Sequence, residues 1–170
     1  MSKPHAYLFA DGSCGSQQNN LGGWASIAVT QSERKVLYGV ACPTTISRCE
    51  LIPIIEGLRW IKQNWVHGPG FRVLAISDSE YTVKTLSGLY ARHKNTDLWA
   101  GLDEVVKGMN VRFRWRERNT LLYMELCDGL CGGFRKEVKL IANDLFGDYR
   151  DAEQQIPYGA LPDDIEENET

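Results

Sequence analysis

The sequence lacks the long apolar stretch that a membrane-spanning helix needs. Hydrophobic residues make up 43% of the 170-residue chain, but no uninterrupted run approaches the ~18 residues that cross a bilayer. The first residues, "MSKPHAYLFADGS", contain no apolar segment ahead of a cleavage site, so no secretory signal peptide is predicted. We therefore expect a cytoplasmic protein with no membrane partner.

Paired cysteines and clustered histidines are also missing. The five cysteines include no C-x-x-C pair, which argues against a zinc ribbon or a thiol redox centre. Cys127 and Cys131 are four residues apart, so on a helix they would share one face as buried free thiols. His5, His67 and His93 are scattered without the spacing of a zinc site. These patterns favour a reducing compartment and structural thiols.

Basic residues are absent from the C-terminal end. Residues 151–170 hold seven of the 22 acidic residues and none of the 19 basic ones, which leaves a net charge of +4 on residues 1–150. A modest positive charge is compatible with a polyanionic partner. Because the end also lacks hydrophobic periodicity, we expect one domain over residues 1–150 and an acidic, disordered tail over residues 151–170. That tail is either solvated or bound in the protein's own basic groove.

Hydrophobic patterning predicts five strands and four helices. The first strand is the apolar run 7–10, which ends at Asp11 and a glycine turn. The others are strands at 22–30, 35–41, 71–77 and 111–117 and helices at 47–65, 79–90, 96–108 and 121–145. Short loops make an antiparallel meander of the first three strands, and crossovers make the fourth and fifth parallel to the first. The predicted fold is α/β, a five-stranded mixed sheet flanked by helices.

Four carboxylates occupy positions where folding does not need an acid. Asp11 and Asp78 each follow a buried strand, Glu50 lies in the first turn of the helix at 47–65, and Asp128 lies early in the last helix. Carboxylates that converge repel one another unless a cation lies between them. Oxygen-only ligands suit Mg²⁺ or Mn²⁺, and two such ions roughly 4 Å apart can catalyse phosphodiester cleavage. The pattern therefore indicates a two-metal phosphodiesterase site.

Each acid also has a purely structural interpretation. Asp11 can open an Asp-Gly turn, and Glu50 can complete a capping box with Ser47 in "SRCE". Asp78 can cap the helix that follows it, and Asp128 can be an exposed helix acid. The joint placement of the four acids is what favours the functional interpretation.

The chain resembles the type I ribonuclease H family in five short segments: "FADGSCG", "SRCEL", "ISDSEY", "NTDLW" and "ELCDGL". They occur in the order of the family and at similar separations, over roughly residues 5–135. The predicted order of strands and helices is also that of the family.

The resemblance implies a two-metal hydrolase that cuts the RNA strand of an RNA/DNA hybrid and leaves a 3′-hydroxyl and a 5′-phosphate. Asp11 would then bridge both Mg²⁺ or Mn²⁺ ions. Asp128 would help hold the ion that activates the attacking water, while Glu50 and Asp78 would hold the ion near the leaving oxygen.

The resemblance also assigns auxiliary groups. Glu125, one helical turn before Asp128, would assist the first ion or product departure, or else be a solvated helix acid. The family has a histidine in the loop before the last carboxylate, and this chain has none there. Arg118 or Asn119 is nearest to that place.

Substrate contacts are implied at four positions: Gly12, Ser13, Thr45 and Trp99. Thr45 matches a family position that holds a DNA phosphate, and Trp99 one that lines the DNA channel. A tryptophan at helical spacing is otherwise a core residue.

Departures from the family leave the substrate open. The asparagines that contact the RNA minor groove in the family are here Ile46 and Ser47, and its basic protrusion is absent. A hybrid-cleaving enzyme is expected to be a monomer. The alternatives are a nuclease that acts on DNA, such as a dimeric Holliday junction resolvase, and a nucleic-acid-binding module with weak or lost turnover.

Overall fold

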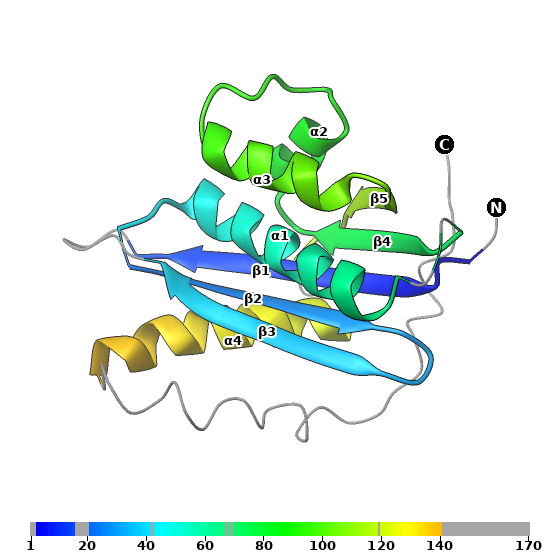
Figure 1. Ribbon diagram of the computed structural model, residues 1–170. Coiled ribbons are helices and arrows are strands. Elements are labelled where there is room, and N and C mark those ends of the chain that lie inside the picture. Colours follow the sequence, from blue (N-terminus) through cyan, green and yellow to red (C-terminus); the bar gives the residue numbers. More distant parts are fainter. Residues whose placement is uncertain are drawn as a thin grey trace.

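The structure of the chain is a computed structural model (Figure 1). It describes residues 3–15, 21–41, 43–66, 68, 70–118 and 120–140, with the exception of the side chains of residues 134–140. The proposed tail at 151–170 lies outside these residues. The elements are, in order, β1 (Ala6–Cys14), β2 (Gly22–Val29), β3 (Arg34–Ala41), α1 (Ile46–Asn64), β4 (Arg72–Ser77), α2 (Glu80–Leu86), α3 (Thr96–Val106), β5 (Asn110–Trp115) and α4 (Leu122–Leu140).

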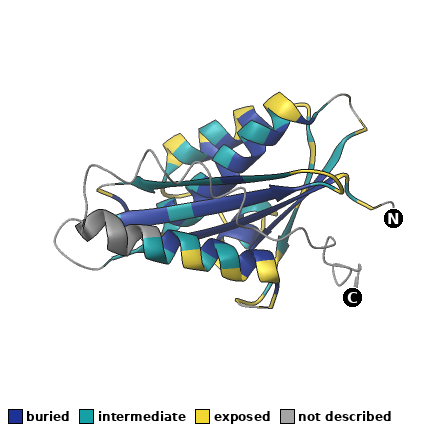
Figure 2. Cartoon of the chain, turned by 90° about the horizontal axis from the view of Figure 1, so that it is seen from below, coloured by how far each residue is buried: buried dark blue, intermediate teal, exposed yellow. Residues whose placement is uncertain are grey.

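The five strands form one mixed sheet in the order β3-β2-β1-β4-β5. β1, β2 and β3 pair antiparallel, whereas β4 pairs parallel with both β1 and β5. The α/β fold class and the predicted strand directions are therefore confirmed. One layer of helices, which contains α1, covers one face of the sheet, and α4 covers the other (Figures 1 and 2).

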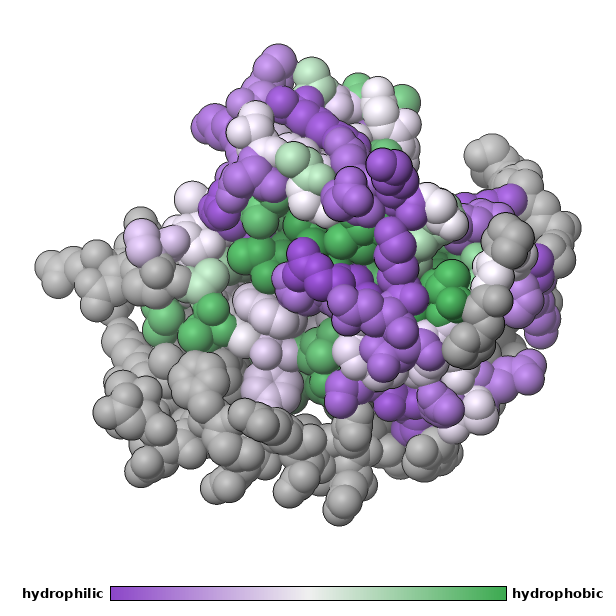
Figure 3. Space-filling view, viewed as in Figure 1, coloured by the Kyte–Doolittle hydropathy of each residue, from purple (hydrophilic) through white to green (hydrophobic). Residues whose placement is uncertain are grey.

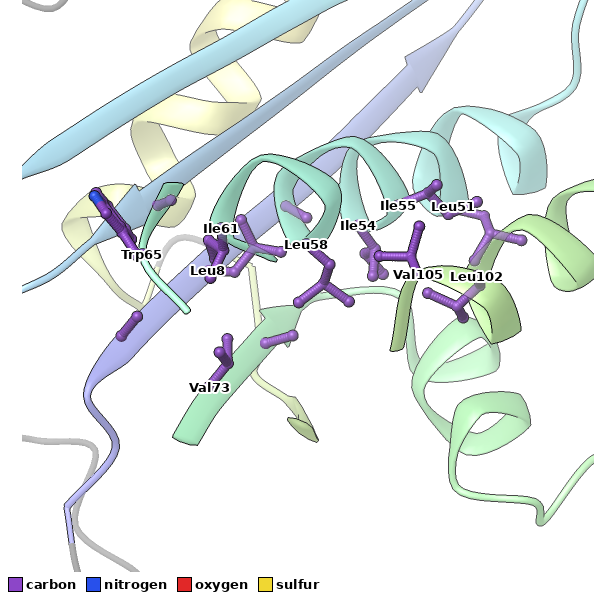
Figure 4. Close-up of a cluster of buried hydrophobic side chains, with 14 of the residues drawn as sticks. Leu8, Leu51, Ile54, Ile55, Leu58, Ile61, Trp65, Val73, Leu102 and Val105 are labelled. Carbon is purple, nitrogen blue, oxygen red and sulfur yellow. The ribbon is translucent and has the colours of Figure 1, made fainter. Parts of the chain in front are cut away.

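The central strand β1 is buried on both faces because its side chains alternate between two cores. Leu8 and Ala10 point to the α1 face, where they join the apolar stripe of α1, residues of α3 and Val73 of β4 (Figure 4). Tyr7 and Phe9 point to the α4 face, and the ring of Phe9 lies 5.0 Å from that of Tyr123. Two hydrophobic cores thus fix the sheet between its helical layers.

Cys127 and Cys131 are fully buried on α4 in the second core. The prediction that they share one helix face as free thiols is confirmed. On the opposite layer, hydrophilic side chains dominate the surface around α2 and α3, while hydrophobic residues appear in a central band below them (Figure 3). None of the helices in the described part of the chain has the length and hydrophobicity needed to cross a bilayer.

β1 is longer than predicted, because it continues through Asp11 and Gly12 to Cys14. Asp11 pairs with Ala25 of β2 and Gly12 with Trp24, so the backbone here belongs to an antiparallel ladder. The interpretation of Asp11 as the start of an Asp-Gly turn is therefore wrong. Strand pairing with β2 overrides the local turn preference of the two residues.

α1 begins at Ile46, one residue before the predicted start, and runs without interruption through Pro53. Proline has no backbone N–H, so the carbonyl of Cys49 lacks its usual helical donor. Gly12 lies against this carbonyl: a Cβ built on Gly12 would be 2.2 Å from the oxygen. The absence of a side chain at Gly12 thus lets α1 approach β1 closely at the end of the sheet that carries Asp11.

The two helices that follow β4 also differ from prediction at their ends. α2 ends at Leu86 instead of residue 90. α3 begins at Thr96 behind Asn95, which adopts a left-handed conformation with φ 58°. The chain before this helix also predicts a cap at Thr96 or Asp97, and this prediction is wrong because the N-cap is Asn95, a residue type that tolerates the left-handed conformation better than most. The side chain of Asp97 instead pairs with Arg48 of α1 at 2.6 Å.

Candidate active site

The parallel register of β1 and β4 brings two of the predicted carboxylates to the same level of the sheet. The ladder ends where Ala10 pairs with Ser77. The next residue on each strand is the acid, Asp11 on β1 and Asp78 after β4. Among the strands that the structure describes, β1 is paired beyond this point with β2 alone, and the chain after β4 turns into α2. Asp11 and Asp78 therefore flank the point where the two strands part.

Asp11 is a buried carboxylate with few donors. Its side chain is 2% exposed, and Oδ1 accepts a 2.7 Å hydrogen bond from the Gly12 amide. The thiol of Cys131 donates to Oδ2 over 3.7 Å. Burial and the nearby charge of Asp78 raise the pKa of Asp11 to about 7. The fold thus holds an acid whose negative charge needs further compensation.

Glu50 projects from the first turns of α1 and is held by the start of α2. Ser79 Oγ donates to Glu50 Oε2 at 2.6 Å, and Thr82 Oγ1 donates to the same oxygen at 3.4 Å. Burial raises the pKa of Glu50, and the hydrogen bond from Ser79 opposes this rise. The prediction that Glu50 forms a capping box with Ser47 is wrong, because the N-cap of α1 is Thr45 and Ser47 lies inside the helix.

Asp78 does not cap the helix that follows it. The N-cap of α2 is Ser79, whose side chain accepts from the Thr82 amide. The Asp78 carboxylate instead accepts a 2.8 Å hydrogen bond from Nε of Arg118, and its backbone carbonyl accepts from the indole of Trp115 at 3.0 Å. The structural interpretation of Asp78 as a cap is therefore wrong.

Asp128 reaches the same cluster from α4, on the other side of the sheet from Glu50. One potential metal-ligating atom of each of Asp11, Asp128 and Cys131 lies within 4.8 Å of the other two. The Asp128 side chain is 43% exposed, so this side of the cluster is open to solvent. Arg118 connects the acids: its guanidinium lies 3.9 Å from Oδ1 of Asp11 and 3.9 Å from Oδ1 of Asp128.

The remaining predicted residues lie in different environments. Ser13 is half-buried on β1 and Thr45 is exposed before α1, while Glu125 is exposed one turn before Asp128. Trp99 is 5% exposed and packs in the core on the α1 face, with the Arg92 guanidinium 4.8 Å above its ring. Asn119 lies outside the described residues.

Three neighbours of the carboxylates were not found from the sequence: Ser79, Thr82 and Cys131. Each follows a predicted acid closely, since Ser79 is adjacent to Asp78 and Cys131 is one helical turn after Asp128. That spacing is the signal that would have placed Cys131 near the site. The contacts of Ser79 and Thr82 with Glu50 join residues 29 and 32 positions apart, so no local pattern reveals them.

Of the four acids, Asp11 and Asp128 bring carboxylate oxygens within 4.8 Å of each other. Asp78 is joined to both through Arg118. Glu50 is close enough to Asp78 for that charge to raise its pKa. Burial, and after it the charge of Asp78, raises the pKa values of both Asp11 and Glu50. Mg²⁺ and Mn²⁺ prefer carboxylate oxygens, so the residues fit either ion.

Comparison with known proteins places the chain in a family. The profile of the RNase H family matches residues 3–118. Ribonuclease H of Caldicellulosiruptor saccharolyticus is 31% identical over 147 residues, which cover 78% of this chain and 97% of that protein. Ribonuclease H of Cupriavidus metallidurans is 33% identical over 121 residues, which cover 64% of this chain and 79% of that protein.

Solved structures show the same fold at lower sequence identity. LC11-RNase H1, solved in complex with an RNA/DNA hybrid, has a TM-score of 0.69 and 15% identity over 79% of this chain and 99% of that chain. The N-terminal RNase H domain of a Mycobacterium tuberculosis protein also has a TM-score of 0.69, with 16% identity over 81% of this chain and 97% of that chain. Since the family profile spans more than half of the sequence, the chain belongs to the ribonuclease H family of hydrolytic nucleases.

Proposed function

We propose that the protein is a metal-dependent endonuclease that hydrolyses the RNA strand of RNA/DNA hybrids. The observation that carries this proposal is the meeting of Asp11, Glu50, Asp78 and Asp128 at one end of the sheet. Family membership supports hydrolytic nuclease chemistry. The hybrid as substrate is supported by the relatives named ribonuclease H and by the similar fold of LC11-RNase H1, which was solved with a hybrid.

In this proposal the four acids would hold two Mg²⁺ or Mn²⁺ ions, and Asp11 would contribute to both. The bound ions would supply Lewis-acid stabilisation of the attacking and leaving oxygens of the phosphodiester. Asp128, whose side chain is 43% exposed, would help hold the ion that activates the attacking water. Glu50 and Asp78 lie on the side of α2, where the leaving 3′-oxygen would be placed.

The surrounding residues orient these acids. Ser79 and Thr82 hold one oxygen of Glu50 and leave Oε1 available to a ligand. The Gly12 amide and the Cys131 thiol fix both oxygens of Asp11. Such neighbouring hydrogen bonds keep carboxylates in a productive orientation and typically change metal affinity about 10- to 100-fold when removed. Exposed Glu125 on α4 is proposed as an auxiliary acid near Asp128.

The substrate is proposed to lie across the exposed start of α1. Thr45 is exposed there and would contact a phosphate, and half-buried Ser13 is proposed as a second substrate contact. Gly12 is buried against α1, so we assign it a packing role and not a contact with substrate. Because Trp99 is buried in the core, we assign it a packing role under α3 and not a direct contact with nucleic acid. We also propose that residues 1–150 act as a cytoplasmic monomer, with the acidic residues 151–170 as an appended tail.

The test is cleavage of four labelled substrates with Mg²⁺ or Mn²⁺: RNA/DNA hybrid, double-stranded RNA, double-stranded DNA and a four-way DNA junction. Asp11→Asn serves as the inactive control. Cleavage of the RNA strand of the hybrid alone is expected. Cleavage of the junction alone, by a protein that is dimeric in solution, would replace the proposal by a junction resolvase. Binding of hybrid without any cleavage would make the chain a nucleic-acid-binding module.

A further inference from the structure

Arg118 occupies the centre of the carboxylate cluster. Three different nitrogens of its guanidinium face three different acids: Nε is 2.8 Å from Asp78, Nη2 is 3.9 Å from Asp11 and Nη1 is 3.9 Å from Asp128. One contact is a hydrogen bond, and the other two are longer ion pairs. A planar guanidinium with donors along three edges is suited to several carboxylates at once, whereas an ammonium group acts as a point charge.

The position of Arg118 in the chain allows this side chain to leave the cluster. Arg118 follows β5, and the chain is anchored two residues earlier by the hydrogen bond from the Arg116 amide to the Ser77 carbonyl at 3.1 Å. The side chain of Arg118 is 57% exposed and belongs to neither hydrophobic core. Withdrawal into solvent would therefore break ion pairs without uncovering apolar surface.

The acids that Arg118 contacts need its charge when no other cation is present. The Asp11 and Asp78 side chains are only 2% and 8% exposed, so their mutual repulsion is poorly screened by water. The guanidinium of Arg118 lies within 3.9 Å of both carboxylates, so its positive charge opposes this repulsion. Arg118 thus compensates the same negative charge that a divalent cation would compensate.

We propose that Arg118 is an exchangeable counter-cation of the active site, bound to Asp11, Asp78 and Asp128 before divalent metal arrives and displaced when metal binds. This inference rests on the proposed function, because it takes the four acids as metal ligands. Its consequence is reciprocal: the contacts that stabilise the metal-free protein weaken metal binding by the same factor. Arg118 would keep the buried acids folded together while setting the metal concentration at which the site fills.

The test compares Arg118→Gln with wild type and with Arg116→Gln, a matched control that removes a neighbouring arginine whose guanidinium donates to the Trp115 carbonyl. Mn²⁺ affinity is measured by calorimetry, and thermal stability is measured in EDTA. Arg118→Gln is expected to bind Mn²⁺ about fivefold more tightly and to melt at a lower temperature in EDTA. Arg116→Gln is expected to match wild type in Mn²⁺ affinity.

A second measurement on wild type does not depend on any variant. The Nε–H resonance of Arg118 in a ¹H–¹⁵N spectrum is expected to exchange slowly without metal and to become rapidly exchanging as Mg²⁺ saturates the protein. Unchanged Mn²⁺ affinity in Arg118→Gln, or an Arg118 resonance that Mg²⁺ leaves unaltered, would overturn the exchange while leaving the metal site in place. If neither wild type nor Arg118→Gln binds Mn²⁺, the result would overturn both the displacement of Arg118 by metal and the metal site of the proposed function.

Discussion

The hydroxyl group of Ser79 donates a 2.6 Å hydrogen bond to Oε2 of Glu50, and so links the start of α2 to the first turns of α1. The same oxygen of Ser79 accepts from the amide of Thr82 and thereby caps α2. One small side chain therefore has two separable tasks: it satisfies a free amide at a helix end and it orients a carboxylate. Its removal should affect both stability and metal binding.

Ser79→Ala is predicted to lower the free energy of unfolding by about 1 kcal/mol, since an N-cap hydrogen bond is lost. It should also weaken Mg²⁺ binding about tenfold, because Glu50 loses its best donor. Urea unfolding and calorimetric titration with Mg²⁺ measure the two effects. Ser87→Ala at the other end of α2, where the hydroxyl donates to the Val83 carbonyl, is the control. Equal Mg²⁺ affinities for the two variants would contradict the orienting role of Ser79.

Gly12→Ala is predicted to destabilise the fold by about 2 kcal/mol, in the range of other overpacked sites. The new Cβ would lie 2.2 Å from the Cys49 carbonyl oxygen and 2.7 Å from the Glu50 amide nitrogen, both of which are backbone atoms that cannot rotate away. Gly101→Ala on α3 meets no atom within 4 Å and should stabilise the helix by about 0.5 to 1 kcal/mol. Urea unfolding of both variants gives the comparison, and a neutral Gly12→Ala would show that α1 can shift.

The pH dependence of the metal-free protein should report Asp11. Folding raises its pKa from 3.8 to about 7, so the folded state binds the proton more tightly than the unfolded state. The contribution of Asp11 to the free energy of unfolding is therefore greatest below pH 4. It declines as pH rises towards 7, by on the order of 4 kcal/mol in total. In EDTA at pH 8, Asp11→Asn should therefore melt at a higher temperature than wild type, and the two should converge near pH 4. A difference in melting temperature between wild type and Asp11→Asn that stays the same from pH 4 to pH 8 would contradict a raised pKa for Asp11.

Mg²⁺ is predicted to raise the melting temperature of wild type, because a ligand that binds only the native state stabilises it by about 2.7 kcal/mol at a hundred times its Kd. The shift should be larger at pH 8 than at pH 5, since Mg²⁺ competes with the proton held by Asp11 at the lower pH. Asp11→Asn should lose most of the shift and reduce hybrid cleavage by roughly a thousandfold. A Mg²⁺ shift of the same size in wild type and Asp11→Asn would remove Asp11 from the metal site.

The sequence predicts where the strands lie from their apolar runs and alternation, and it predicts their directions from the lengths of the connections between them. Leu8 and Phe9 alternate between the two cores as a central strand requires. The order of the acids along these elements was likewise enough to expect Asp11 and Asp78 at one end of the sheet, where the register of Ala10 and Ser77 indeed places them.

Features that depend on contacts between distant residues were not predictable in this way. The extension of β1 beyond Asp11 comes from pairing with β2, which outweighs the turn preference of Asp-Gly. The true partner of Glu50 is Ser79, the N-cap of α2, and not Ser47, which lies three residues before Glu50. Arg118 was placed near the site only by its resemblance to a family position, and its contacts with three acids arise from the way the chain turns after β5.

Glu50 and Asp128 belong to helices on opposite faces of the sheet, and this arrangement links the site to the cooperativity of folding. Neither helix alone, nor the sheet with one layer of helices, brings all four acids together. Local unfolding of α4 would remove Asp128 from Asp11 even if β1 and α1 stayed intact. At the proposed metal site, affinity for a divalent ion is therefore expected to measure how completely all three layers have assembled.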